Sequence, residues 1–462
     1  MSISVRDQIR SHYKAVDTSQ ETVGWAEIVA RLDTDASPVA APRRSGRTAV
    51  WVAVAAAVVT ILLIGVIPLL VNNPETPPAD TVVPTTPVES TPTTLGELVL
   101  ITGTWSRVPR DEAVFGGGGG SGIGSVTVGG PGLVAVGGDD ENLAVWTSVD
   151  GITWSRVPHD ETVFGGADIS MRSVTVGGPG LVAVGWDGET LADIPDSDAA
   201  VWTSVDGIVW SRVPHDEEVF GSAFMESVTA GGPGLVAVGM DGPWGDGDAA
   251  VWTSVDGFTW TRVPHDETVF GGVDSQVIND VTVGGPGLVA VGNDGGRGPW
   301  DNNAENNAAV WTSVDGFTWS RVPDDETVFG GGGNPVMLSV TAGGPGLVAV
   351  GADFYPANLA ETAVWTSVDG IKWSRIPDDA TFFGATSVTA GGPGVVAVGG
   401  DGDGLGVWTS ADGITWSRVP DDGTVFGGGG SDWISEVTVG GPGLVAVGTY
   451  GGNAAVWVSE KD

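Results

Sequence analysis

The chain has 462 residues, no cysteine and a formal net charge of -39. Without cysteine, neither disulfides nor thiolate metal sites are available. Residues 101–462 hold 12 Lys and Arg against 48 Asp and Glu, a balance that excludes nucleic acid and anionic lipid surfaces as expected partners of that region.

Residues 1–48 are close to neutral, with seven basic and six acidic side chains. Ile9, Tyr13 and Val16 share helical spacing, and so do Trp25, Ile28, Val29 and Leu32, so two short helices are predicted. This layout resembles the cytoplasmic stubs of actinobacterial membrane proteins, including anti-sigma-factor-like ones. A solvated tail with one amphipathic helix is the alternative.

Residues 49–71 form an uncharged, apolar stretch of 23 residues, long enough to cross a bilayer as a helix. Arg43, Arg44 and Arg47 precede it, and the next basic residue is Arg107. The positive-inside rule then predicts a single-pass protein of the cell membrane with a cytoplasmic N-terminus and the rest of the chain outside. A signal peptide is the alternative, although no small-residue cleavage site follows.

Residues 72–100 are rich in Pro and Thr, and this composition cannot bury a core. We expect an extended extracytoplasmic linker between the membrane segment and the remaining domain, residues 101–462.

The domain 101–462 is built from repeats. The phrase Gly-Gly-Pro-Gly-Leu-Val-Ala-Val-Gly occurs seven times, 48 to 59 residues apart, with Val395 replacing Leu in one copy. The copies begin at Gly129, Gly177, Gly231, Gly284, Gly343, Gly391 and Gly440. Each repeat divides into four short strand candidates, which in the second copy are 173–177, 181–185, 200–204 and 208–213. Four antiparallel strands repeated radially predict the blades of an all-β propeller.

The two ends of the repeat region complement each other. A lone fourth strand stands at Gly103–Val108, and the last copy supplies only first, second and third strands, ending near Ser459. Pairing of these ends would complete a seventh blade and remove exposed sheet edges. We therefore predict a closed, monomeric, seven-bladed propeller.

Fourteen of the twenty tryptophans recur on the third and fourth strands and are predicted to be core. A two-residue Asp-Gly turn between these strands would place Trp146 opposite Ser155 and Trp154 opposite Thr147, with the two rings on opposite faces of the blade. The repeated arginine of Ser-Arg-Val-Pro is expected to play a structural role between blades.

The stretch Ser148-Val-Asp-Gly-Ile-Thr-Trp154 resembles the Asp box, the BNR-like repeat of sialidase-superfamily propellers. Each copy is one residue shorter between Asp and Gly than the usual box. The resemblance implies a structural role for the box aspartates, which are Asp150, Asp206, Asp256, Asp315, Asp369 and Asp412.

Sialidases of this superfamily use three clustered arginines, a Tyr nucleophile with a Glu partner, and an Asp acid. The resemblance therefore raises a sialidase-like glycoside hydrolase as one possible activity. The candidates outside the repeat pattern are Arg110, Arg172, Arg297, Tyr355 and Tyr450. No recognisable catalytic motif surrounds them, so a protein without enzymatic activity is favoured.

The connections after the second and fourth strands vary between repeats and share one face of the predicted ring, which is where function is expected on a rigid scaffold. Aromatic residues on this face are the ligand-binding candidates: Trp186, Trp244, Trp300, Trp433 and Tyr355. The alternative is that these rings only close loops over the propeller.

No cofactor is indicated, although Ca²⁺ is a candidate at Gly245–Asp248 and Asp401–Gly404, where oxygen ligands cluster. The favoured function is a membrane-anchored, extracytoplasmic binding module for a glycan, peptide or protein. The alternatives are the sialidase-like hydrolase and a surface signalling or structural protein that acts through its cytoplasmic stub.

Overall fold

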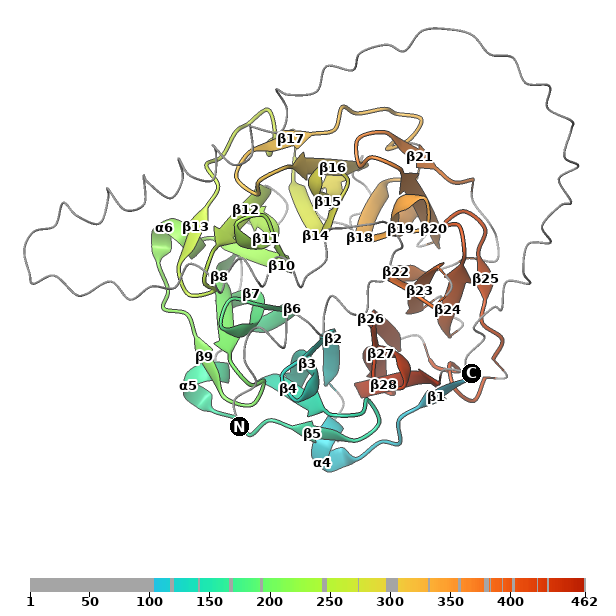
Figure 1. Ribbon diagram of the computed structural model, residues 1–462. Coiled ribbons are helices and arrows are strands. Elements are labelled where there is room, and N and C mark those ends of the chain that lie inside the picture. The colour runs from blue at the N-terminus through green and yellow to red at the C-terminus, as the bar shows by residue number, and fades with distance from the viewer. Residues whose placement is uncertain are drawn as a thin grey trace, which may run out of the picture. The chain divides into compact units, whose positions relative to one another are not determined.

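In a computed structural model, the described residues are 104–460, apart from 117–119, 140–141, 166–168, 192–193, 243–246, 273, 296–305, 331–332, 356–358, 378–381, 383, 393, 401–403, 422 and 430–431. They lie within a compact unit, Thr93–Asp462. Seven four-stranded antiparallel sheets stand around a common axis, as the blades of a propeller (Figure 1). The predicted all-β, seven-bladed propeller is therefore confirmed.

Each blade begins at the axis with its first strand and ends at the rim with its fourth (Figure 1). The first three blades contain β2 (Gly122–Gly129), β3 (Gly132–Asp139), β4 (Asn142–Ser148) and β5 (Trp154–Arg156); β6 (Ser170–Gly177), β7 (Gly180–Leu191), β8 (Ile194–Ser204) and β9 (Trp210–Arg212); and β10 (Ala223–Gly231), β11 (Gly234–Asp241), β12 (Asp248–Ser254) and β13 (Trp260–Arg262).

The next three blades contain β14 (Gln276–Gly284), β15 (Gly287–Asp294), β16 (Asn307–Ser313) and β17 (Trp319–Arg321); β18 (Pro335–Gly343), β19 (Gly346–Tyr355), β20 (Leu359–Ser367) and β21 (Trp373–Arg375); and β22 (Ala385–Gly391), β23 (Gly394–Gly400), β24 (Leu405–Ser410) and β25 (Ser417–Arg418).

The seventh blade closes the ring from both ends of the domain. It combines β26 (Trp433–Gly440), β27 (Gly443–Tyr450) and β28 (Asn453–Glu460) with β1 (Trp105–Arg107). Trp105 pairs with Ser459, and Arg107 pairs with Trp457, in antiparallel register, so the predicted pairing of the two ends is confirmed. The sheet edges at the two ends therefore cover each other.

The described helices are single turns in the connections between blades: α4 (Glu112–Phe115), α5 (Glu161–Phe164) and α6 (Glu217–Phe220). Among the residues that the structure describes, no helix has the length and apolar character needed to cross a membrane. The predicted fold combined a transmembrane helix with the propeller. This prediction is wrong for the described fold, which consists of the propeller alone. Residues 1–48, 49–71 and 72–100 lie outside the described residues.

Among the described residues, the core consists of seven large apolar clusters, each shared by two neighbouring blades, and two smaller ones. The second strands are buried on both faces, and Val134, Ala135 and Val136 are each 0% exposed. The third-strand tryptophans are 0–1% exposed. The Nε1 atoms of six of them donate to carbonyls in the connection from the previous fourth strand, as Trp146 does to Val114 at 2.6 Å. The recurring tryptophans are core residues, as predicted.

The turn between the third and fourth strands differs from the prediction. Ser148 lies opposite Trp154, and Trp146 lies opposite Arg156, so the loop contains residues 149–153 instead of two residues. Because partners across a strand pair share a face, Trp146 and Trp154 lie on the same face and join one cluster with the seventh blade. The prediction of opposite faces is wrong.

The wider turn has a local cause. Asp150 Oδ1 accepts from the backbone N–H groups of Ile152 at 2.9 Å and Thr153 at 2.7 Å. Ser148 Oγ accepts from Gly151 N at 2.8 Å. These side-chain acceptors satisfy the amides that a tight hairpin would pair across the strands, so the loop opens by three residues.

Candidate functional site

A β-bulge interrupts the first strand of every blade. In β2, Ile123 pairs with Gly137 and Ser125 pairs with Val136, which leaves Gly124 unpaired. The other six strands repeat this shift. The unpaired residues are Gly124, Arg172, Glu226, Asn279, Leu338, Thr386 and Ser435. A bulge redirects its side chain, so all seven can turn toward the axis.

These seven residues line one pocket of about 250 Å³ on the propeller axis, which we call the axial pocket. The residue after each bulge also lines it: Ser125, Ser173, Ser227, Asp280, Ser339, Ser387 and Glu436. The remaining lining residue is Trp433. The bulges lie near the beginnings of the first strands, so the pocket belongs to the face with the variable connections.

The residues after the bulges join neighbouring blades. Ser125 Oγ accepts from Val174 N at 3.1 Å, and Ser173 Oγ accepts from Val228 N at 3.2 Å. Ser339 Oγ accepts in the same way from Val388 N at 3.2 Å. This serine therefore links the first strand of one blade to that of the next blade.

Two blades carry a carboxylate where the others carry serine. Asp280 Oδ2 accepts from Val340 N at 2.8 Å, and Glu436 Oε2 accepts from Val126 N at 2.7 Å. Desolvation raises the pKa of Asp280, and it raises the pKa of Glu436 to about 7, with a smaller contribution from the charge of Asp280. Near neutral pH, Glu436 is therefore poised between its acid and its carboxylate.

The bulge side chains differ in chemistry. Arg172 Nε donates to Glu226 Oε2 at 2.9 Å, and the attraction to Glu226 raises the pKa of Arg172. Asn279 Nδ2 donates to Met337 O at 2.8 Å. The pocket wall thus offers one paired cation, three carboxyl groups, an amide and several hydroxyls.

Trp433 and Trp186 have different surroundings. Trp433 is the first residue of β26, 36% exposed, and lines the axial pocket. Trp186 lies within β7, half-buried, with its ring edge-on to Phe224 at 5.5 Å and the Arg172 guanidinium over it at 5.4 Å. Trp433 is therefore placed to meet a ligand directly, whereas Trp186 supports Arg172.

The other ligand-binding candidates give less information. Trp244 and Trp300 lie outside the described residues, and only the backbone of Tyr355 is described, within β19.

A second hollow of about 220 Å³ adjoins the axial pocket, with Gly124, Arg172 and Ser435 lining both. Glycines of the first blade form much of it, and a Cβ added to Gly124 would meet only backbone oxygens, at 3.5 Å or more. The two hollows together form a groove that runs from the axis over the first blade.

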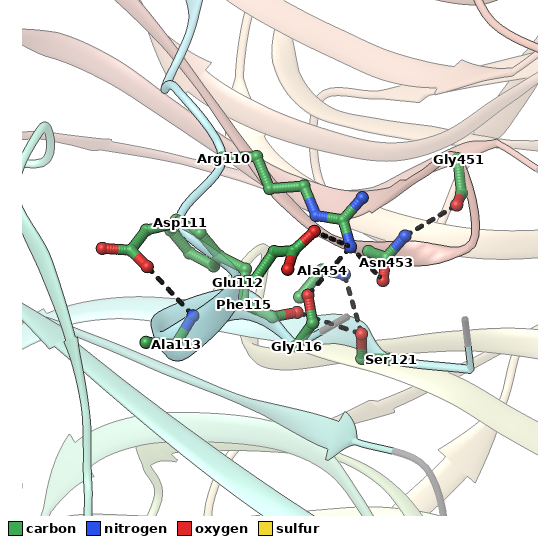
Figure 2. Close-up of polar contacts among 10 residues, drawn as sticks. All are labelled: Arg110, Asp111, Glu112, Ala113, Phe115, Gly116, Ser121, Gly451, Asn453 and Ala454. Atoms are coloured by element: carbon green, nitrogen blue, oxygen red, sulfur yellow. Dashed lines mark hydrogen bonds and ion pairs between the residues drawn. The ribbon is translucent and has the colours of Figure 1, made fainter. Parts of the chain in front are cut away.

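The sialidase-like candidates do not gather in one place. Arg172 lines the axial pocket, whereas Arg110 and Tyr450 line a different pocket in the seventh blade. Arg110 donates there to Gly116 O and Asn453 Oδ1, both at 3.0 Å (Figure 2). Arg297 lies outside the described residues. Among the described residues, therefore, no arginine triad faces a Tyr–Glu pair.

The six turn aspartates repeat the hydrogen bonds of Asp150. Backbone N–H donors, foremost that of the third residue after each Asp, hold the pKa values of these carboxyls below their usual range. The aspartates are Asp150, Asp206, Asp256, Asp315, Asp369 and Asp412. Their carboxylates stabilise the turns, which lie on the face away from the variable connections.

Two clusters of carboxylate and imidazole side chains lie at the connections after the fourth strands. Asp198, His215 and Glu217 form one group with the spacing of a cation site, and the equivalent residues of the next blade form another; most are exposed. Residues 243–246 and 401–403, which hold most of the predicted Ca²⁺ loops, lie outside the described residues.

The sequence analysis did not identify the seven bulge positions that form the axial pocket, although the sequence contains a signal for them. The motif Ser/Asp/Glu-Val-Thr is nearly constant, yet the residue before it is Gly124, Arg172, Glu226, Asn279, Leu338, Thr386 or Ser435, a different residue type in each of the seven copies. Such variation within a constant phrase marks a position that the scaffold does not restrict.

No protein-family model and no curated protein matches the chain, so membership of the Asp-box sialidase superfamily is not confirmed. Among solved structures, the chain is similar to one titled "Crystal structure of polysaccharide lyase Uly1", with 12% identity and a TM-score of 0.44 over 79% of this chain and 95% of that chain. With a TM-score below 0.5, this similarity adds no argument about function.

Proposed function

We propose that the propeller is a carbohydrate-binding module that holds a neutral or amino sugar at the axial pocket. The observation that carries the proposal is the set of seven bulge positions, which bring seven different residue types to one pocket beside the exposed Trp433. A uniform frame with a varied pocket fits selective recognition of a ligand.

The chemistry of the pocket favours a sugar. The Trp433 ring offers an apolar face for the C–H groups of a pyranose, and Glu226, Asn279 and Asp280 offer acceptors and a donor for hydroxyls. Glu226 is already paired with Arg172, so no excess positive charge awaits an acidic sugar. The adjoining groove gives a chain of more than one sugar room to extend.

A glycan array probed with the full-length chain tests the proposal. We expect binding to neutral or amino-sugar oligosaccharides, and Trp433→Ala should weaken it about tenfold, because an aromatic contact contributes on the order of 1 kcal/mol. Phe258→Ala is the matched control, since Phe258 is 54% exposed in a turn between third and fourth strands. Binding to no glycan, or equal losses for both variants, would contradict the proposal; binding to peptides alone would reassign the pocket.

A glycoside hydrolase is a second candidate, favoured by the raised pKa of Glu436. A carboxyl group that keeps its proton near neutral pH can act as a general acid toward a glycosidic oxygen. Release of reducing ends from a bound oligosaccharide would support this candidate. Glu436→Gln should abolish that release and retain binding. If the oligosaccharide stays intact after prolonged incubation, hydrolysis is refuted and the binding-module proposal remains.

A further inference from the structure

A repeated arginine at the end of each fourth strand is normally neutralised within its own blade. In the first five blades it forms an ion pair with an aspartate of the second strand, and Arg321 and Arg375 also donate to carbonyls in the connection from the preceding blade. The pairs are Arg156–Asp139, Arg212–Asp187, Arg262–Asp241, Arg321–Asp294 and Arg375–Asp353.

The seventh blade breaks this pattern. Its second strand ends in Tyr450, where the other six repeats have aspartate. The Cζ atom of Arg107, the repeated arginine of this blade, lies 3.5 Å from the centroid of the Tyr450 ring. Its Nη1 atom is buried and has no hydrogen-bond partner among the described residues. In place of the aspartate of the other repeats, this guanidinium therefore faces an aromatic ring.

A second arginine lies close by. Arg110 occupies a position that is His or Asp in the other six repeats. Its hydrogen bonds to Gly116 O and Asn453 Oδ1 both use Nη2, and that atom is also 4.0 Å from Glu112, whose side chain is 78% exposed (Figure 2). The rest of the guanidinium is left for another partner.

Both arginines line a cavity of about 400 Å³ at the seam between β1 and β28, which we call the closure pocket. Among the described residues, no Asp or Glu lines it, although residues 101–462 carry a net charge of -36. Val108, Phe115, Val425 and Val456 supply apolar walls. The pocket is thus a positively charged, largely apolar cavity in a strongly acidic domain.

We propose that the closure pocket binds a small carboxylic acid with an apolar body. The carboxylate would take the place that aspartate holds in the other blades, since arginine forms strong charge-assisted hydrogen bonds with carboxylates. The apolar body would contact the valine walls, and the volume lies within the usual range for ligand pockets. This inference does not depend on the axial pocket.

Benzoate and its neutral isostere benzamide test the proposal by calorimetry and thermal unfolding of the full-length chain. We expect saturable binding of benzoate and a rise in Tm, with at least tenfold weaker binding of benzamide. Equal effects of the two compounds, or no binding of benzoate at millimolar concentration, would overturn the proposal.

Two variants copy other blades and should therefore fold. Tyr450→Asp restores the aspartate of the other six repeats, and Arg110→His introduces the residue of the next three. Each should weaken benzoate binding at least tenfold, and Trp433→Ala, in the axial pocket, should leave it unchanged. Undiminished benzoate binding by both Tyr450→Asp and Arg110→His would refute the assignment to this pocket.

Discussion

The carboxyl group of Glu436 gives a direct test of the axial pocket, because its protonation is coupled to folding. Its pKa is raised from 4.5 to about 7, first by desolvation. Between these two values the folded chain holds a proton that the unfolded chain has lost. Stability therefore decreases as the pH rises through this window, and the loss is complete above pH 7.

The difference between the two pKa values corresponds to a loss of about 3 kcal/mol in folding stability when Glu436 ionises. Partial solvent access reduces the expected loss to about 2 kcal/mol. Glu436→Gln removes the charge and keeps an oxygen to accept from Val126 N, which Glu436 Oε2 now contacts at 2.7 Å. The variant should exceed the natural protein by less than about 1 kcal/mol at pH 5, where only part of the penalty has developed, and by about 2 kcal/mol at pH 8. For a unit of this size, that is a Tm increase of roughly 2–3 °C.

Thermal unfolding by circular dichroism at pH 5, 6, 7 and 8 measures this difference directly. Glu326→Gln is the control, since Glu326 is an exposed carboxylate outside the axial pocket. A difference between Glu436→Gln and the natural protein that stays constant from pH 5 to pH 8 would refute the argument that burial holds a proton on this group.

Two further predictions concern the frame. Gly137→Ala should prevent folding, because its Cβ would lie 2.1 Å from Gly122 O, whereas Gly124→Ala, with nothing closer than 3.5 Å, should be tolerated; soluble yield and Tm distinguish them, and equal behaviour would contradict the packing. Acid should unfold the propeller as the turn aspartates protonate. Because their pKa values are lowered in the folded state, the ionised carboxylates stabilise the fold above about pH 4, and this stabilisation is lost at lower pH. Asp150→Asn should reduce the loss of stability between neutral and acid pH. A pH dependence of stability equal to that of the natural protein would argue against the turn aspartates as its source.

The blade count and the closure were predictable because each depends on counting repeats. The phrase that begins at Gly129 fixes the second strand, and the lone strand around Trp105 completes a blade that lacks its fourth strand. Neither conclusion requires knowledge of a side-chain contact. A regular sequence therefore determines topology well.

Side-chain direction was less predictable. The Asp-Gly pair suggested a two-residue turn, but Ser148 and Asp150 bind the loop amides and shift the register. Since side chains alternate along a strand, this shift moved Trp154 to the face that Trp146 occupies. The axial bulges were missed for a similar reason: an extra residue in one strand appears only when both strands are paired.

The seventh blade also differs from the others in how it forms. In the first blade, Arg156 meets Asp139 across a separation of 17 residues, a contact that folds locally. Arg107 and Tyr450 are 343 residues apart, as are Arg110 and Asn453, so their contacts form only when the ring closes. A ligand that joins β1 to the end of β27 would therefore stabilise the closed ring against the open chain. The closure pocket is for this reason a place where a small molecule could change the stability of the whole propeller.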